Sequence, residues 1–270
     1  MTMDRLHVLG TGNAMVTKIF NTCAVLELSG KYLLLDCGGG NGILQRLEAA
    51  QIDTREIHDV FISHEHCDHL LGAVWIVRNA AAKMLNGKFD GDLRIYCHQG
   101  LVDTIKTLCE LCLQKKFTKL IGKRIQIISL KDKEKKEIIG KDFTFFDIRS
   151  TKATQFGFVT TLTNGEKLSF MGDEPINSKC ELYAENASWL LCEAFCLLKD
   201  ALRFKPYEKH HSTVADAAKL AERLNVKHML LWHTEQATGP MRKVAYTSEA
   251  AEFFNGEVIV PNDLDIVSLS

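Results

Sequence analysis

The segment HEHCDH, residues 64–69, constrains the fold of this chain more than any other feature. It follows DVFIS, a short apolar run that is typical of a buried strand. In an extended chain, side chains at positions i and i+2 point to the same side, so His64 and His66 could bind one metal ion. The chain then turns into a helix that begins near His69, which lets Asp68 and His69 face a second position. The segment therefore predicts a metal site at the end of a strand.

Two further apolar strands end on side chains that can bind a metal ion. KLSFMG leads into Asp173, and KHMLLW leads into His233. Ligand sites of α/β folds lie outside the carboxyl ends of strands, so we expect these residues to gather at one edge. Imidazole and carboxylate donors suit Zn²⁺, and also Mn²⁺ or Fe. Asp36 ends another apolar strand, and we expect it to brace the metal loop through hydrogen bonds.

Strands and helices alternate along the chain, and no low-complexity linker divides it. Each half of the sequence carries both kinds of element. We therefore predict one domain, residues 1–270, of the α/β (α+β) class, with two sheets packed together and helices outside them. The charged run 131–137 is expected to be a solvated hairpin tip. A helix is expected over residues 248–254.

The composition limits which binding partners and which cellular compartment we expect. Charged residues make up 25% of the chain and the net charge is −1, which gives no support for a large basic face that wraps nucleic acid. No stretch approaches 18 uninterrupted apolar residues, so we expect no membrane-spanning helix. The nine cysteines are an odd number and no secretory signal precedes them, so we expect reduced thiols and a cytoplasmic protein.

The motif H-x-H-x-D-H after a strand resembles the signature of the metallo-β-lactamase superfamily. MGDE resembles the segment with the aspartate that bridges two metals, here Asp173, and LLWHTE resembles the segment with the last histidine ligand, here His233. The resemblance covers nearly the whole chain. It implies a four-layer αββα sandwich and a hydrolase that holds one or two Zn²⁺ ions.

Within the superfamily, the chain looks most like the ribonuclease Z-like branch. A strand ending in CEAF supplies Glu193, and a helix opening with HST supplies His211. The resemblance implies that His211 contacts the scissile phosphate or protonates the leaving oxygen, and that Glu193 orients it. It also implies hydrolysis by a metal-activated water, with Asp68 as a ligand that could take the proton of that water. A histidine held by a carboxylate is a good general acid.

The chain departs from the family pattern at two places. The branch has a further histidine ligand near the position of Thr151, and no histidine lies between His98 and His210 here. The branch also carries an extended tRNA-binding arm, whereas only 14 residues, FVTTLTNGEKLSFM, separate Gly157 from Gly172. A small phosphodiester, such as a cyclic nucleotide or a cyclic sugar phosphate, therefore fits better than tRNA, and an RNA end is the other substrate that we consider.

Two alternatives stay open at this point. The same fold could cleave a thioester, a lactone or a β-lactam, and the pair Glu193 and His211 is the feature that favours a phosphodiester instead. Because the histidine near Thr151 is missing, the chain could also be a binding protein with a degenerate metal site. Metal content and turnover of bis(p-nitrophenyl) phosphate separate these cases. A homodimer is considered because fold relatives form one.

Overall fold

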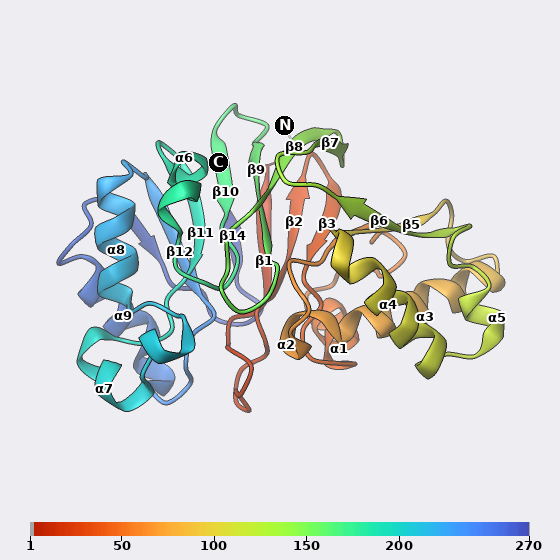
Figure 1. The fold of residues 1–270 in the computed structure, drawn as a ribbon, viewed down its shortest axis with the longest axis horizontal. Helices are drawn as coiled ribbons and strands as arrows, with labels where there is room; N and C mark the ends of the chain where they lie inside the picture. The colour runs from red at the N-terminus through yellow and green to blue at the C-terminus, as the bar shows by residue number, and fades with distance from the viewer. Residues whose placement is uncertain (1–2, 270) are drawn as a thin grey trace.

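Two seven-stranded sheets form the centre of the molecule in the computed structural model, which describes residues 3–269 (Figure 1). The first sheet has the order β14-β1-β2-β3-β4-β5-β6, with the bounds β1 Arg5–Gly10, β2 Cys23–Leu28, β3 Lys31–Leu35, β4 Asp59–Phe61, β5 Leu93–His98, β6 Ile125–Leu130 and β14 Ile266–Ser268. The second sheet has the order β13-β12-β11-β10-β9-β8-β7, with the bounds β7 Lys135–Ile138, β8 Lys141–Asp147, β9 Phe156–Thr161, β10 Lys167–Phe170, β11 Trp189–Glu193, β12 His228–Trp232 and β13 Glu257–Ile259.

Each sheet is antiparallel in one part and parallel in the other. In the first sheet β3, β4, β5 and β6 run parallel, and in the second sheet β10, β11, β12 and β13 do. The carboxyl ends of parallel neighbours meet at one edge of a sheet, which is where ligand sites form. This topology brings the residues that follow β4, β10, β11 and β12 to common edges.

Helices cover the outer face of each sheet, so the layers run helix, sheet, sheet, helix (Figure 1). The first sheet is covered by α1 Gly42–Ala49, α2 Cys67–Leu70, α3 Gly72–Leu85, α4 Gln99–Cys112 and α5 Lys115–Thr118. The outer face of the second sheet is covered by α8 Val214–Arg223 and α9 Arg242–Ala250, while α6 Glu181–Ala184 and α7 Ala201–Phe204 lie near its two ends. Short 3-10 turns lie at Ser178–Cys180, Leu198–Asp200, Tyr207–Lys209 and Gly239–Met241. The predicted αββα sandwich is confirmed.

Aromatic side chains fill the space between the two sheets. The ring of Phe61, at the end of β4, lies 5.3 Å from the ring of Phe145 and 5.6 Å from that of Phe158 in the facing sheet. Phe170 at the end of β10 packs on Phe158 and on Trp232. Burying each such ring stabilises the fold by about 1.5–3 kcal/mol. The strands that lead to the expected metal site are therefore anchored just before they end.

The structure differs from the sequence prediction at two elements. The charged run 131–137 is not only a hairpin tip, because Lys135–Ile138 forms β7, the edge strand of the second sheet. Lysine-rich edge strands resist pairing with other chains, which explains how a polar run can be a strand. Helix α9 begins at Arg242 and ends at Ala250, earlier than the predicted range 248–254. No helix within residues 3–269 is long and apolar enough to cross a bilayer.

Candidate metal centre

Strand ends bring the expected metal ligands together. His64 lies three residues after the end of β4, Asp173 lies three residues after β10, and His233 follows β12 directly. His233 has a positive φ of 56°, a conformation that is uncommon for a residue with a side chain and often marks a functional site. The structure thus gathers side chains from distant parts of the sequence.

A first group of donors consists of His64, His66 and Asp173. The Nε2 atom of His64 lies 2.9 Å from Nδ1 of His66 and 3.6 Å from Oδ2 of Asp173. His64 and Asp173 are buried, and His66 is half-buried. The two histidines of this group point the way that the extended chain predicts.

A second group consists of Asp68, His69 and His233. Oδ2 of Asp68 lies 3.3 Å from Nε2 of His69 and 3.5 Å from Nε2 of His233. Oδ2 of Asp173 lies 3.6 Å from the same atom of His69 and 3.4 Å from that of His233. All four side chains are buried. The six predicted ligands therefore form two adjoining groups that share Asp173.

The donor atoms of the second group are arranged as metal ligands rather than as hydrogen-bond partners of one another. The Nε2 atoms of His69 and His233 are buried and have no hydrogen-bond partner among the described residues. Ligands at about 2.0–2.2 Å from a tetrahedral ion lie roughly 3.3 Å apart, close to the separations found here. Buried unpaired polar atoms are costly, so such a cluster indicates a missing partner. The residues present fit a divalent metal ion.

The electrostatics of the cluster also favour a cation. Burial alone would raise the pKa of Asp68 and of Asp173, but the surrounding histidines hold both pKa values well below the usual range. Burial lowers the pKa of His69, yet the charges of Asp36 and Asp68 outweigh this and raise it well above its usual value. Two buried carboxylates therefore stay ionised beside the histidines, and negative charge at this place attracts a cation.

Asp36 braces the metal loop, as expected. Its Oδ1 accepts a hydrogen bond from the backbone N–H of Ser63 at 2.7 Å, and its Oδ2 accepts one from the Ser63 hydroxyl at 2.8 Å. The same Oδ2 lies 2.7 Å from Nδ1 of His69. With Nδ1 bonded to a carboxylate, Nε2 of His69 is left free to face a metal. The carboxylate thus orients the imidazole of His69 and holds the loop.

The loop that precedes β9 supplies other contacts in place of the missing histidine. The hydroxyl of Thr151 lies 2.7 Å from Nδ1 of His210, on the exposed surface. Gln155 is buried, and its Nε2 lies 3.0 Å from Nδ1 of His64 and 2.6 Å from Oδ1 of Asp173. Within residues 3–269, the first group contains two histidines and no third.

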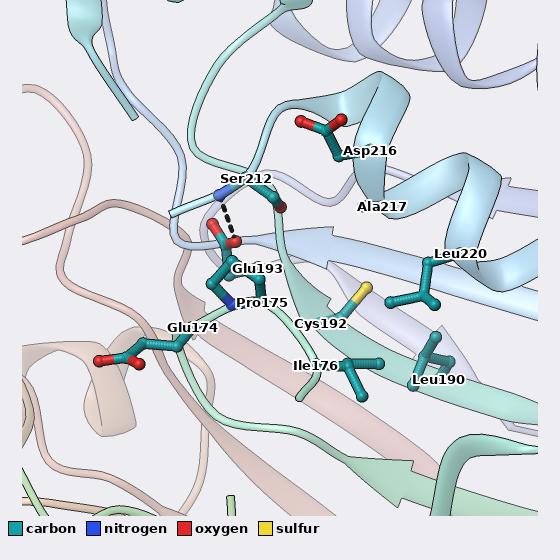
Figure 2. Close-up of a pocket in the computed structure, with 10 residues that line it drawn as sticks. All are labelled: Glu174, Pro175, Ile176, Leu190, Cys192, Glu193, Ser212, Asp216, Ala217 and Leu220. Carbon is teal, nitrogen blue, oxygen red and sulfur yellow. Dashed lines mark hydrogen bonds between the residues drawn. The ribbon is translucent and has the colours of Figure 1, made fainter. Parts of the chain in front are cut away.

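Glu193 and His211 lie close to each other, and the ring of His211 lies 5.1 Å from that of His233. Oε1 of Glu193 accepts a hydrogen bond from the backbone N–H of Ser212 at 2.7 Å, as Figure 2 shows. Its Oε2 lies 3.7 Å from Nδ1 of His211, and both atoms are buried with no hydrogen bond to any residue from 3 to 269. Burial raises the pKa of Glu193 to about 8 and lowers that of His211 to about 3. Both groups are therefore neutral at pH 7, and a single proton could pass between them.

Phe195 and Lys209 were not expected in the site, whereas Lys152 was considered as a residue that could reach the substrate. The Phe195 ring stacks on His211 with centroids 4.9 Å apart, and Nζ of Lys209 lies 5.1 Å from the Phe195 ring centroid. Nζ of Lys152 donates to the backbone carbonyl of Lys209 at 3.1 Å and lies 3.5 Å from Glu174. These side chains border a cavity of about 340 Å³, which is also lined by Asn13, Met15, His66, Cys67, Asp68, Asp173, His211 and His233. The sequence signal for Phe195 was its place in CEAF, directly after the strand that supplies Glu193.

A protein-family comparison decides the affiliation. The model described as Anti-Pycsar protein Apyc1 matches residues 4–255, which is most of the chain. The chain belongs to the Apyc1 family.

Known relatives of this Apyc1-family chain place it in the superfamily that the sequence suggested. It is 26% identical to ribonuclease Z of Thermococcus sibiricus over 304 aligned positions, which cover 97% of this chain and 95% of that protein. It is 30% identical to zinc phosphodiesterase ELAC protein 2 of Mus musculus, over 84% of this chain but only 29% of that protein. The metallo-β-lactamase fold protein YhfI of Bacillus subtilis has the same fold, with a TM-score of 0.79 at 17% identity over 98% of this chain and 99% of that one. The Apyc1-family chain is a ribonuclease Z-like, metal-dependent hydrolase of the metallo-β-lactamase superfamily.

Proposed function

We propose that this protein is a zinc-dependent phosphodiesterase that hydrolyses a small, cyclic phosphodiester. One observation carries the proposal. The cavity of about 340 Å³ is lined by His66, Asp68, Asp173 and His233 from the two metal groups and also by His211, whose imidazole faces Glu193. A phosphodiester in this cavity would meet a cation and a proton donor at the same time, which is the pairing that phosphodiester hydrolysis needs.

The size of the cavity and the chain around it favour a small substrate. The volume lies near the lower end of the roughly 300–1,000 Å³ that is usual for small-molecule sites. Strands β9 and β10 are joined by a turn of five residues, Leu162–Glu166, which leaves no room for a long nucleic-acid-binding arm. A cyclic nucleotide or a cyclic sugar phosphate is therefore the substrate class that we infer. An RNA end is the second candidate, because a relative over almost the whole chain is a ribonuclease Z.

The metal donors point to zinc. His64, His66, Asp68, His69, Asp173 and His233 offer imidazole nitrogens and carboxylate oxygens, a donor set that suits Zn²⁺ and is also used by Mn²⁺ and Fe. When bound, such an ion would polarise a phosphoryl oxygen and make water more acidic. The carboxylate of Asp68, which lines the cavity, is the group that we infer accepts the proton of the attacking water.

Protonation of the leaving oxygen is the step that we assign to Glu193 and His211. As the bond from phosphorus to the leaving oxygen breaks, Nε2 of His211 gives that oxygen a proton. Nδ1 of His211 faces Oε2 of Glu193, which is protonated at neutral pH and can replace the proton. The stacked ring of Phe195 keeps the imidazole in plane for this transfer. The water oxygen stays on phosphorus, so bonds and protons balance.

The proposal is tested by turnover of purified, zinc-loaded protein. Substrates are bis(p-nitrophenyl) phosphate, 2′,3′- and 3′,5′-cyclic nucleotides, a precursor tRNA with a 3′ trailer, and a thioester and a lactone. We expect cyclic phosphodiesters to be hydrolysed fastest, and D68N to lose most of that activity. D103N, on the exposed face of α4, is the matched control. Cleavage of the thioester or lactone without cleavage of any phosphodiester would refute the proposal, and preference for the tRNA would favour the second candidate.

A further inference from the structure

The two donor groups differ in the number of ligand residues that they do not share with each other. The second group has Asp68, His69 and His233, whereas the first has only His64 and His66 besides the shared Asp173. The position where the branch has another histidine holds Thr151, whose hydroxyl lies beside His210 instead. The first group therefore lacks one ligand that the second group does not need.

Asp173 cannot offer one oxygen to each group, because one of its two carboxylate oxygens is already hydrogen-bonded. Its Oδ2 faces Nε2 of His64 at 3.6 Å and Nε2 of His233 at 3.4 Å. Its Oδ1 accepts a hydrogen bond from Nε2 of Gln155 at 2.6 Å. With Oδ1 engaged, a single oxygen atom must be divided between two ions. Besides this shared oxygen, an ion in the first group would have two protein ligands, and an ion in the second group would have three.

Burial differs in the same direction, because His66 is the one member of either group that is not fully buried. Asp68, His69 and His233 are buried, and the carboxylate of Asp36 fixes the ring of His69. His66 is half-buried and lies at the beginning of the short helix α2. A ligand that is less buried loses more conformational freedom on binding and competes with water more often.

We propose that the two groups bind divalent ions unequally: Asp68, His69 and His233 with Oδ2 of Asp173 hold one ion tightly, and His64 with His66 holds a second, exchangeable ion. This inference rests on the metal dependence in the proposed function. Loss of an outer-shell partner costs about 10–100-fold in metal affinity, and loss of a direct ligand costs no less. We therefore expect the two dissociation constants to differ by at least about tenfold.

The test measures bound zinc per chain by elemental analysis after dialysis against chelator-buffered zinc at graded free concentrations. The native protein should bind in two steps, one ion before the other. H66Q should lose the weak step and keep the tight one, whereas H233Q should lose the tight one. T151H should strengthen the weak step alone, and T151N, which also alters the contact with His210 but adds no imidazole, should not. Circular dichroism establishes that each variant is folded.

The outcomes separate this inference from the proposed function. Two equally tight ions in the native protein would overturn the inference, and so would loss of the tight ion in H66Q. Unequal binding in a protein that hydrolyses no phosphodiester would support the inference and refute the proposed function. A folded native protein that retains no zinc at any concentration would overturn both.

Discussion

Nδ1 of His69 lies 2.7 Å from Oδ2 of Asp36, a residue 33 positions earlier that directly follows β3. The contact fixes which nitrogen of the imidazole faces the metal groups, because the other nitrogen is held by a carboxylate. Asp36 itself has a positive φ of 54° and binds Ser63 through both oxygens. The orientation of a ligand thus depends on a residue that does not touch the metal position.

Replacing this aspartate should weaken metal binding more than folding. Asn tolerates a positive φ and keeps the shape of the side chain, so D36N should change the melting temperature little. It loses the charge that favours a proton on Nδ1 of His69, and we expect zinc affinity to fall by about 10–100-fold. Competition against a zinc chelator measures the change. D53N, an exposed aspartate paired with Arg55, is the control, and equal affinities for D36N and the native protein would contradict the expectation.

The start of α3 depends on the absence of a side chain at Gly72. A Cβ atom there would overlap the backbone carbonyl of Cys37, next to Asp36 on the metal side of the sheet. The backbone N–H of Gly72 also donates to the carbonyl of Gly38 at 2.9 Å, so the helix cannot simply move away. G72A should therefore lower the free energy of unfolding by about 2 kcal/mol or more.

Chemical denaturation checks this value against a second glycine. A Cβ atom added at Gly40 would meet no other atom within 4 Å, so G40A should stay within about 0.5 kcal/mol of the native protein. Similar stabilities for the two variants would show that the helix tolerates a shift away from Cys37.

The metal ligands could be predicted because each follows a strand. A buried apolar run identifies the strand, and the carboxyl ends of parallel strands share an edge, so His64, Asp173 and His233 were expected together from the sequence alone. The parallel pairing of β10, β11 and β12 confirms the reason for Asp173 and His233. His64 follows β4 of the other sheet, so the packing of the two sheets brings it to the same place. Their roles as ligands stay predictions, supported by the two donor groups.

Contacts that depend on packing between distant elements could not be predicted. Gln155 reaches Asp173 only because the loop before β9 lies against the end of β10, and no spacing rule encodes that distance. The early start of α9 has a similar cause. No side chain caps this helix at Met241, and the positive charge of Arg242 in its first turn is unfavourable for the helix dipole. The guanidinium of Arg242 is nevertheless buried and donates to the hydroxyl of Thr234 at 2.8 Å, so tertiary contacts outweigh the local pattern.

Lys152 should contribute to substrate binding. Its ammonium group borders the cavity and is held by the carbonyl of Lys209 and by Glu174, so it supplies positive charge near the expected phosphate. K152A should raise KM for a cyclic phosphodiester by about tenfold, the effect of one hydrogen bond to a charged group, with a smaller change in kcat. Steady-state kinetics at constant ionic strength measure both. K205A, whose ammonium group pairs with Glu208 on the same loop, should behave like the native protein, and an unchanged KM in K152A would exclude the contact.

Glu193 should make the stability of the metal-free protein fall as the pH rises. Burial raises its pKa from 4.5 to about 8 in the folded protein, so between these values the folded state holds a proton that the unfolded state has released. The free energy of unfolding must then decrease with pH in this window. The stabilising contribution is complete below pH 4.5 and is lost as the pH passes 8.

E193Q isolates this contribution. The amide cannot ionise, and its oxygen can still accept the hydrogen bond from the backbone N–H of Ser212. In the presence of a chelator, the free energy of unfolding of the native protein minus that of E193Q should fall by at least about 1.4 kcal/mol between pH 5 and pH 8, the equivalent of one pKa unit. Denaturant titrations at several pH values give this difference, and other titrating groups cancel because both proteins share them. A difference that stays flat or rises with pH would mean that Glu193 is ionised in the folded protein, and the proton that we assign to the pair with His211 would then be absent.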